Sequence, residues 1–178
     1  MEHYLNFSNT NIWSEIWPEL ALALAAIVLL GIDLFRKSDK PIVSIGSLAI
    51  VFQAGLLIFH LFDYLAWHHT FDRETFSGML HQGIQGDVMR TFFLLSSLLV
   101  SVLGHQYLKN KELRAGEFHH LTMLATAGLM LLVQSNHFIM LFVALETVAV
   151  CFYTLVAYNR ESAKSLEAGI KYLIFGAL

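Results

Sequence analysis

The chain has 178 residues, of which 56% are hydrophobic and only 14% are charged. Soluble domains carry roughly 25% charged residues, and a soluble chain of this length could not hide so much apolar surface, so the composition excludes an ordinary soluble fold. The net charge of −3 gives no reason to expect a nucleic-acid partner. Because the apolar residues come in long blocks, they indicate helices surrounded by lipid.

Six apolar blocks follow one another along the chain, and each is expected to form a helix. They cover about residues 18–35, 42–65, 88–108, 118–133, 138–158 and 162–178. Segments of roughly 20 residues match a hydrocarbon core of about 30 Å. The sequence therefore predicts an all-α fold, a polytopic transmembrane helix bundle with five complete spans and a truncated sixth. We expect residues 1–178 to form a single transmembrane domain, with a polar connection over about 66–87.

The first block opens at Pro18 and is expected to be retained as a span, because the seventeen residues before it contain no Lys or Arg. Eight Lys and Arg residues lie in the connections on one side of the membrane, and two, Arg73 and Arg90, lie on the other. By the positive-inside rule the N-terminus lies outside the cytoplasm. Interfacial positions are expected for Glu19 and Asp33, and for the tryptophans Trp13, Trp17 and Trp67.

Glu146 is the first candidate for chemistry, because it lies eight residues into the fifth block, about 12 Å below its start. An isolated carboxylate at that depth takes up a proton, whereas a basic neighbour keeps it ionised. A side chain of this kind is suited to a proton relay. The alternative is a protonated glutamate that only forms a hydrogen bond between helices.

Lys171 lies inside the sixth block, with Glu167 one turn before it and Lys164 one turn before that. This spacing places the three side chains on one helix face and favours an ion pair from Glu167 to Lys171. The three residues Glu146, Glu167 and Lys171 are the candidate proton pathway. A local pair that only neutralises itself is the alternative for Glu167 and Lys164.

The remaining polar residues suggest structural roles. His119 and His120 are adjacent, so they cannot converge on one metal from a single helix, and a solvated or interfacial role is expected. No metal site is predicted. His60 and His105 could hydrogen-bond between helices or join a proton path, while Ser97, Ser101, Ala127 and Gly128 offer small side chains for close helix packing. Cys151 is expected to be a buried, inert thiol.

Several stretches of the sequence resemble one known family. They are the stretch from Leu145 through Arg160 and, above all, the run from Ser165 to Leu178 (SLEAGIKYLIFGAL), with PEL at the start of the first block and Gly86-Asp87 before the third. This pattern resembles subunit N of respiratory complex I, the proton-translocating NADH-quinone oxidoreductase, within the antiporter-like membrane subunits. The resemblance runs over essentially the whole chain and is most specific from Glu146 onward.

The resemblance implies that Glu146 is the fifth-helix glutamate of the proton pathway and that Lys171 and Glu167 are its sixth-helix lysine and acidic residue. It implies that the chain is the N-terminal part of a longer antiporter-like subunit, whose main lysine partner for Glu146 lies on a later helix. Other membrane subunits of complex I and the lipid bilayer would be its partners. NADH, flavin, Fe–S clusters and quinone would be handled by other subunits, so this chain would bind no cofactor and catalyse nothing alone.

Two other functions remain open from the sequence. A cation/proton antiporter subunit of a multi-subunit transporter would use the same Glu and Lys residues. A purely structural membrane-assembly protein would tolerate neutral replacements at Glu146 and Lys171.

Overall fold

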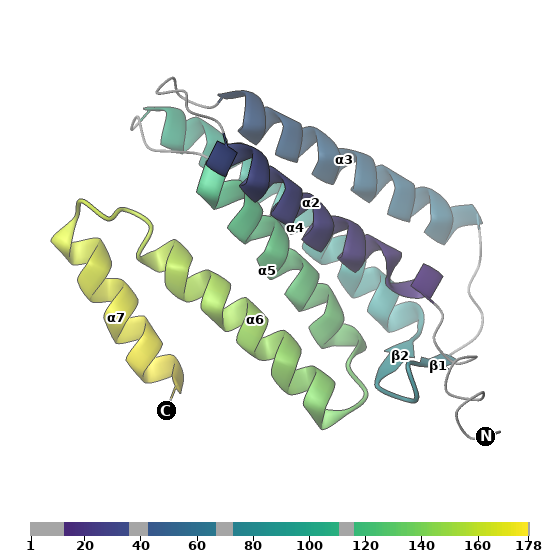
Figure 1. Ribbon diagram of the computed structural model, residues 1–178. Coiled ribbons are helices and arrows are strands. Elements are labelled where there is room, and N and C mark those ends of the chain that lie inside the picture. The colour runs from purple at the N-terminus through teal and green to yellow at the C-terminus, as the bar shows by residue number, and fades with distance from the viewer. Residues whose placement is uncertain (1–12, 36–42, 67–72, 111–115, 178) are drawn as a thin grey trace.

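The computed structural model describes residues 13–35, 43–66, 73–110 and 116–177, and these residues are predominantly helical (Figure 1). After a short 3₁₀ turn, η1 (Trp13–Ile16), the described residues form six α-helices: α2 (Trp17–Phe35), α3 (Val43–Ala66), α4 (Ile84–Asn110), α5 (Gly116–Gln134), α6 (Phe138–Val156) and α7 (Ala163–Ala177). Each predicted apolar block coincides with one of them. The predicted all-α bundle is therefore confirmed.

Four of these helical stretches are long and apolar enough to cross a membrane: Trp13–Phe35, Gly46–Leu65, Ile84–Asn110 and Phe138–Val156. The helix α7 is shorter, with 15 residues. The helix α5 has 19 residues but carries His, Thr, Gly and Gln side chains among its apolar ones. The predicted five spans and shorter sixth thus appear as helices, although α5 does not qualify as a span by its own composition.

The position of α5 explains why it can carry polar side chains among its apolar ones. It contacts α2, α3, α4 and α6, and therefore lies at the centre of the bundle. Its buried side chains occur all around the helix rather than along one stripe. A helix that is surrounded by protein does not need lipid-compatible side chains, so α5 can hold buried polar groups that the outer helices would expose to lipid.

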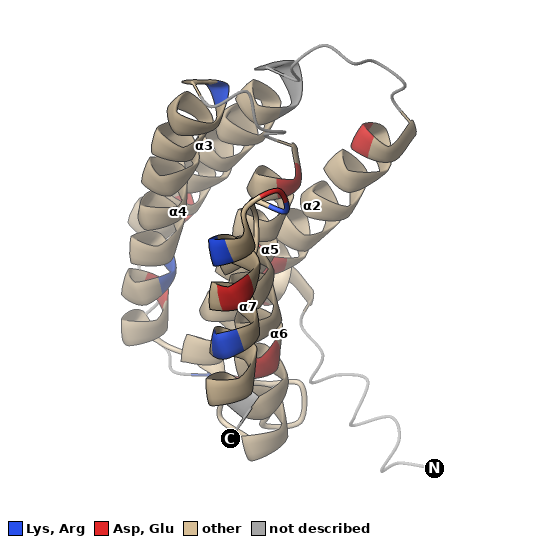
Figure 2. Cartoon of the chain, turned by 90° about the vertical axis from the view of Figure 1, so that its left-hand side faces the viewer, with Lys and Arg blue, Asp and Glu red and all other residues tan. Residues whose placement is uncertain are grey.

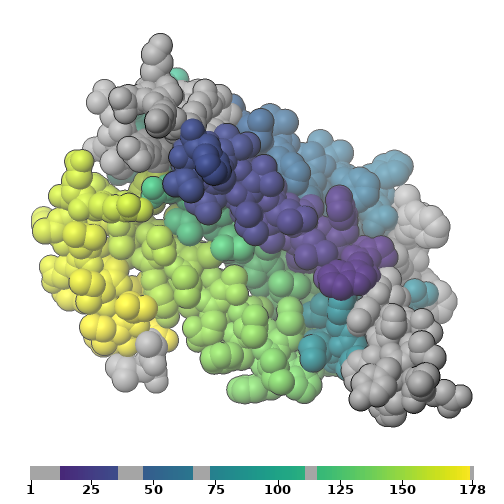
Figure 3. Space-filling model, in the orientation of Figure 1, coloured from purple at the N-terminus to yellow at the C-terminus, as the bar shows by residue number. Residues whose placement is uncertain are grey.

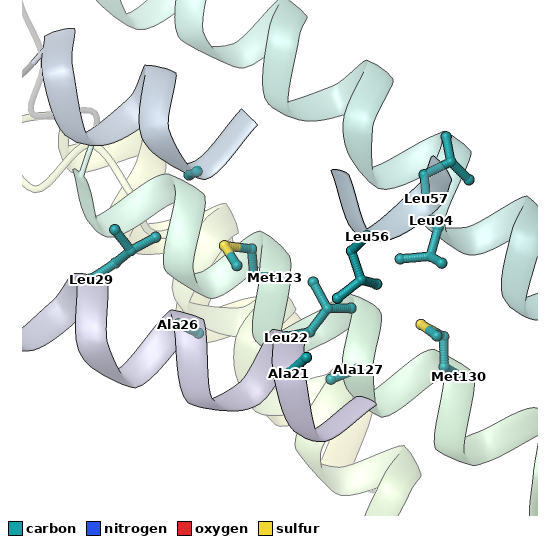
Figure 4. Close-up of a cluster of buried hydrophobic side chains, with 11 residues drawn as sticks. Ala21, Leu22, Ala26, Leu29, Leu56, Leu57, Leu94, Met123, Ala127 and Met130 are labelled. Atoms are coloured by element: carbon teal, nitrogen blue, oxygen red, sulfur yellow. The ribbon is translucent and has the colours of Figure 1, made fainter. Parts of the chain in front are cut away.

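The apolar core lies where α2, α3, α4 and α5 meet (Figure 4). Leu22, Leu94, Met123 and Met130 are among its largest fully buried side chains. The alanines of α2 and α5 in this cluster, which Figure 4 labels Ala21, Ala26 and Ala127, bring the two helix backbones close together. Cys151 of α6 is also buried, as predicted.

A short β-hairpin precedes α4, which the sequence did not predict. Its strands β1 (Arg73–Thr75) and β2 (Leu80–Gln82) are antiparallel, with Thr75 opposite Leu80. The turn between them has positive φ at three residues, including 52° at Phe76 and 59° at Ser77. The hairpin also meets the turn between α5 and α6, because Asn136 N donates to Met79 O at 2.9 Å. The expected polar connection thus contains a folded element, and α4 begins at Ile84, before the predicted Val88.

The helices α6 and α7 form the other edge of the molecule (Figure 3). They run antiparallel, with Gly169 against Ala157 and Gly176 against the Tyr153 side chain. The rings of Tyr153 and Tyr172 meet edge to face with centroids 5.1 Å apart. On its other side α6 packs on α5, where a Cβ at Gly128 would lie 2.8 Å from Val148 Cγ2. The predicted close packing at Gly128 is therefore confirmed.

This close approach generates a prediction for Gly128→Ala. The added methyl group forces Val148 to move, and we expect it to destabilise the fold by about 1–3 kcal/mol, the usual cost of overpacking. Thermal unfolding of the purified full-length subunit in detergent measures the effect. Gly31→Ala in α2 is the matched control, because nothing lies within 4 Å of its Cβ position. Equal melting temperatures for the two variants would contradict the packing argument.

Candidate functional site

Glu146 lies near the middle of α6, on the side that faces away from the rest of the bundle. The side chains of α6 that are buried are Ala144, Val148 and Cys151, and Ala144 and Val148 contact Gly128 of α5. Glu146 is offset from them by about half a turn of helix and is exposed. Among the described residues no hydrogen bond or ion pair involves its carboxylate. The carboxylate of Glu146 is therefore exposed near the middle of α6, on the outward side of that helix.

Glu167 and Lys171 form an ion pair on α7, as predicted, with Lys171 Nζ 2.5 Å from Glu167 Oε1. Both side chains are 64% exposed. The glutamate stands N-terminal to the lysine, which is the favourable order on a helix. Figure 2 shows basic and acidic bands alternating along this face of α7, and an acidic band on α6.

Glu146 is not joined to this pair. The contacts of α6 with α7 are at Ala157 and Tyr153, and Tyr153 is level with Gly176 and Tyr172. Glu146 lies two further turns along α6, about 10 Å beyond Tyr153. The structure therefore brings Glu167 and Lys171 together and leaves Glu146 at a different depth on the same side of the molecule.

A second cluster of charged residues lies buried at the opposite edge of the bundle, and the sequence did not reveal it. Arg90 of α4 forms a two-point ion pair with Glu19 of α2, with Nε 2.7 Å from Oε1 and Nη2 2.8 Å from Oε2. Arg90 is 4% exposed and Glu19 is 3% exposed. The sequence places Glu19 at the interface and Arg90 at the start of the third block, and it does not predict that both side chains are buried in protein and paired.

Further hydrogen bonds complete this cluster. Arg90 Nη2 donates to the Glu15 carbonyl oxygen at 2.8 Å, and Nη1 donates to Asp87 Oδ1 at 3.1 Å. Gln134, at the end of α5, donates to Glu19 Oε1 at 2.6 Å and accepts a short hydrogen bond from Gln82 of the hairpin. The sequence signal was an acidic residue in the first turn of α2 and a basic residue in the second turn of α4, since both helices start at the same end of the bundle.

At the opposite end of the helices, the charged side chains that pair are more exposed than Glu19 and Arg90. Arg160 Nη2 lies 2.8 Å from Glu117 Oε2, and the Arg160 side chain is 74% exposed. Tyr158, in the loop after α6, packs on Phe118, and burial, together with the charge of Glu117, raises the pKa of Tyr158 to about 12. This tyrosine therefore stays neutral at any physiological pH.

The histidines of α5 also depart from the prediction. His119 is 0% exposed and His120 is 8% exposed, so neither is solvated or interfacial. They are buried because α5 is enclosed by other helices, which a single sequence block cannot show. Trp13 and Trp17 are exposed at the start of α2, as expected of interfacial anchors, whereas Trp67 lies outside the described residues.

Comparison with known proteins agrees with the resemblance. A family model described as "NADH:quinone oxidoreductase/Mrp antiporter, TM" matches residues 135–178, the stretch that holds Glu146, Glu167 and Lys171. NADH-quinone oxidoreductase subunit N 1 of Opitutus terrae is 42% identical over the whole of this chain and 35% of its own length. Subunit N of Xanthomonas euvesicatoria is 36% identical over 90% of this chain and 32% of its own length. Subunit N of Methylovorus glucosotrophus is 31% identical over 98% of this chain and 35% of its own length.

These matches show that the chain is similar along its whole length to subunit N of NADH-quinone oxidoreductase. It spans about a third of the length of the curated relatives it matches. The apolar helices, together with this similarity, place it in the membrane. The candidate residues Glu146, Glu167 and Lys171 all lie on the outward side of α6 and α7.

The buried Glu19–Arg90 pair and the exposed Glu117–Arg160 pair should contribute differently to the stability of the fold. Arg90→Gln leaves Glu19 buried without its partner, and we expect a loss of about 3–5 kcal/mol of stability. Arg160→Gln is the control, because an exposed pair contributes at most about 1 kcal/mol. Denaturant unfolding of the full-length subunit in detergent compares them. Equal losses would refute the structural role of the buried pair, whereas partial recovery in Glu19→Gln/Arg90→Met would support it.

Proposed function

We propose that this chain is part of a proton-translocating membrane subunit of NADH-quinone oxidoreductase, in which Glu146 takes up and releases a proton. The observation that carries the proposal is the carboxylate of Glu146 at mid-depth on the outward side of α6. A carboxylate that faced lipid would be costly, so this side is best suited to contact with protein or water. The match of the family model to this stretch supports the same assignment.

The proposed mechanism requires a movable positive charge near Glu146. When a basic side chain approaches, the ionised carboxylate is favoured, and when it withdraws, the protonated form is favoured. A proton can then enter from one side of the membrane and leave toward the other. The basic group must come from outside the described residues, because Lys171 pairs with Glu167 and lies at a different depth.

Glu167 and Lys171 are proposed as a second station on the same pathway. Their pair is exposed on α7, so Lys171 can exchange Glu167 for another carboxylate without leaving a buried charge unpaired. Such an exchange would change the electrostatic potential along the outward side of α6 and α7. The same proposal assigns NADH, flavin, Fe–S clusters and quinone to other subunits, with coupling to this chain through membrane-subunit partners.

The orientation of the chain is also a proposal. Arg90 belongs to the buried cluster, so of the two basic residues counted on the N-terminal side only Arg73 remains a surface charge. Arg160 and Lys164 lie exposed at the opposite ends of the helices. This difference favours an orientation in a bacterial inner membrane that leaves the N-terminus outside the cytoplasm. The charges at 36, 37, 40, 111 and 114 lie outside the described residues.

The test is Glu146→Gln in the full-length subunit, assembled in its complex in membrane vesicles. We expect the number of protons moved per NADH oxidised to fall by about half or more, because the amide cannot carry a proton. Glu161→Gln, in the exposed loop before α7, is the matched control and should keep the full proton yield. Both variants should retain electron input from NADH to an artificial acceptor. An unchanged proton yield for Glu146→Gln would reject the proposal.

A cation/proton antiporter subunit is the second candidate, because the matching family model also names the Mrp antiporter. The two functions differ in what drives the proton. If deletion of the gene makes growth sensitive to sodium and leaves NADH oxidation by membranes unchanged, the antiporter function is correct. If deletion removes NADH-linked proton pumping at unchanged sodium tolerance, the complex I function is correct.

A further inference from the structure

A file of polar side chains runs between α3 and α4, away from the side that holds Glu146. The residues on α3 stand seven apart, which places them on one helix face, and those on α4 likewise share a face. The file contains Gln53 and His60 of α3, Ser97, Ser101 and His105 of α4, and His119 of α5, with Gly46 at one end and Arg90 at the other.

Two contacts fix how the helices align. Near the start of α3, Gly46 lies against His105 of α4. Near the end of α3, His60 lies against the backbone of Asp87 and close to Arg90. The antiparallel register between these contacts brings Gln53 level with Ser97. From Arg90 to His105, α4 rises about 22 Å, most of the hydrocarbon thickness of about 30 Å.

The polar atoms of this file are buried and have no partners in the described part of the chain. They are both polar side-chain atoms of Gln53, the hydroxyls of Ser97 and Ser101, His60 Nε2, His105 Nδ1 and both ring nitrogens of His119. Gln53 is 1% exposed, and Ser101 and His119 are 0% exposed. A buried polar group without a partner costs about 1–3 kcal/mol, so a row of them is expensive as mere packing. These groups both donate and accept hydrogen bonds, which water can satisfy.

The two imidazoles at one end of the file converge on a single point. A Cβ at Gly46 would lie 2.5 Å from His105 Nδ1 and 2.7 Å from His119 Nε2. The ring centroids are 5.6 Å apart. Only a glycine leaves this space open, and a neutral imidazole can accept a proton on one nitrogen while it releases one from the other. His119, with both nitrogens unpartnered, has the arrangement of a relay.

We propose that this file is a second, water-assisted proton path, which joins the Glu19–Arg90 cluster at one membrane surface to the His105–His119 pair near the other. Each serine hydroxyl, water and imidazole accepts a proton on one side and releases one on the other, so no net charge stays in the file. Leu57 follows Gln53 by one turn on α3, and Leu94 stands between Arg90 and Ser97 on α4; both are buried in the apolar core and act as the barrier that prevents a leak. The inference rests on the proposed function only in that the subunit translocates protons.

The charged groups around the two ends fit this role. Asp87, Glu19 and Arg90 lie close enough to His60 at one end to interact with it electrostatically. At the other, His120 lies beside His119, with Asp33 and Glu117 close to it. Asp33 packs against the start of α5, where the helix dipole favours a carboxylate. Both ends therefore carry groups that can exchange protons with the membrane surface, while the middle contains only neutral side chains.

The experiment uses the full-length subunit in its assembled complex in membrane vesicles and measures protons moved per NADH oxidised. Gly46→Ala fills the point on which the two imidazoles converge, and Gly55→Ala on the same helix is its control, because nothing lies within 4 Å of that Cβ position. Ser101→Ala and Ser97→Ala each remove one hydroxyl from the file, and Ser96→Ala removes one from beside it. We expect the proton yield of the three file variants to fall by about half or more. A proton must pass each group of the file in turn, so the loss of one group interrupts the whole path. The two controls should match the unsubstituted complex.

Four outcomes separate this inference from the proposed function. Full proton yield in Ser97→Ala and Ser101→Ala, with a loss in Glu146→Gln, overturns the file and leaves the proposed function standing. Loss in the file variants with full yield in Glu146→Gln supports the file and rejects the role of Glu146. If Gly46→Ala prevents assembly, the two serine variants decide, because removing a hydroxyl leaves helix packing intact. An equal loss in Ser96→Ala overturns the inference, since the effect would then be general to α4.

Discussion

The buried ion pair between Glu19 and Arg90 is the interaction on which the arrangement of the helices depends. Both side chains leave water, at a cost of several kcal/mol per ion, and only close pairing with further hydrogen bonds offsets that cost. The structure supplies these bonds from the 3₁₀ turn, the hairpin and the end of α5. Because an uncompensated charge would remain buried if any of these elements slid past its neighbour, the pair fixes α2, α4 and α5 at one common depth.

The position of Glu146 follows from this constraint in two steps. Gln134 holds the end of α5 to Glu19, and the short turn after it directs α6 back along α5. Gly128 then allows Val148 and Ala144 to approach the α5 backbone, which sets the rotation of α6 about its axis. With that face of α6 committed to α5, Glu146 can only point outward. Among the described residues, packing alone orients the acidic group of the candidate pathway, because none of them pairs with it.

Local properties of the sequence were enough to predict the helices, the mid-helix depth of Glu146 and the Glu167–Lys171 pair. Each of them depends on residues close together in the chain. The ion pair between Glu19 and Arg90 joins residues 71 apart, and the burial of His119 results from four helices around α5. The hairpin was missed for another reason. Its strands have three residues each, and its turn uses positive φ at Phe76 and Ser77, a conformation that residues other than glycine adopt uncommonly.

The modest hydropathy of the enclosed helix α5 has a consequence for how the chain enters the membrane. Insertion that sorts segments one at a time by apolar character would accept α4 and α6 readily and α5 poorly. Only three residues, 135–137, separate α5 from α6. The two helices therefore suit entry as a pair, in which the apolar α6 carries the polar α5 into the bilayer. The buried histidines and glutamine of α5 would then reach their final surroundings only after α2 and α4 had closed around it.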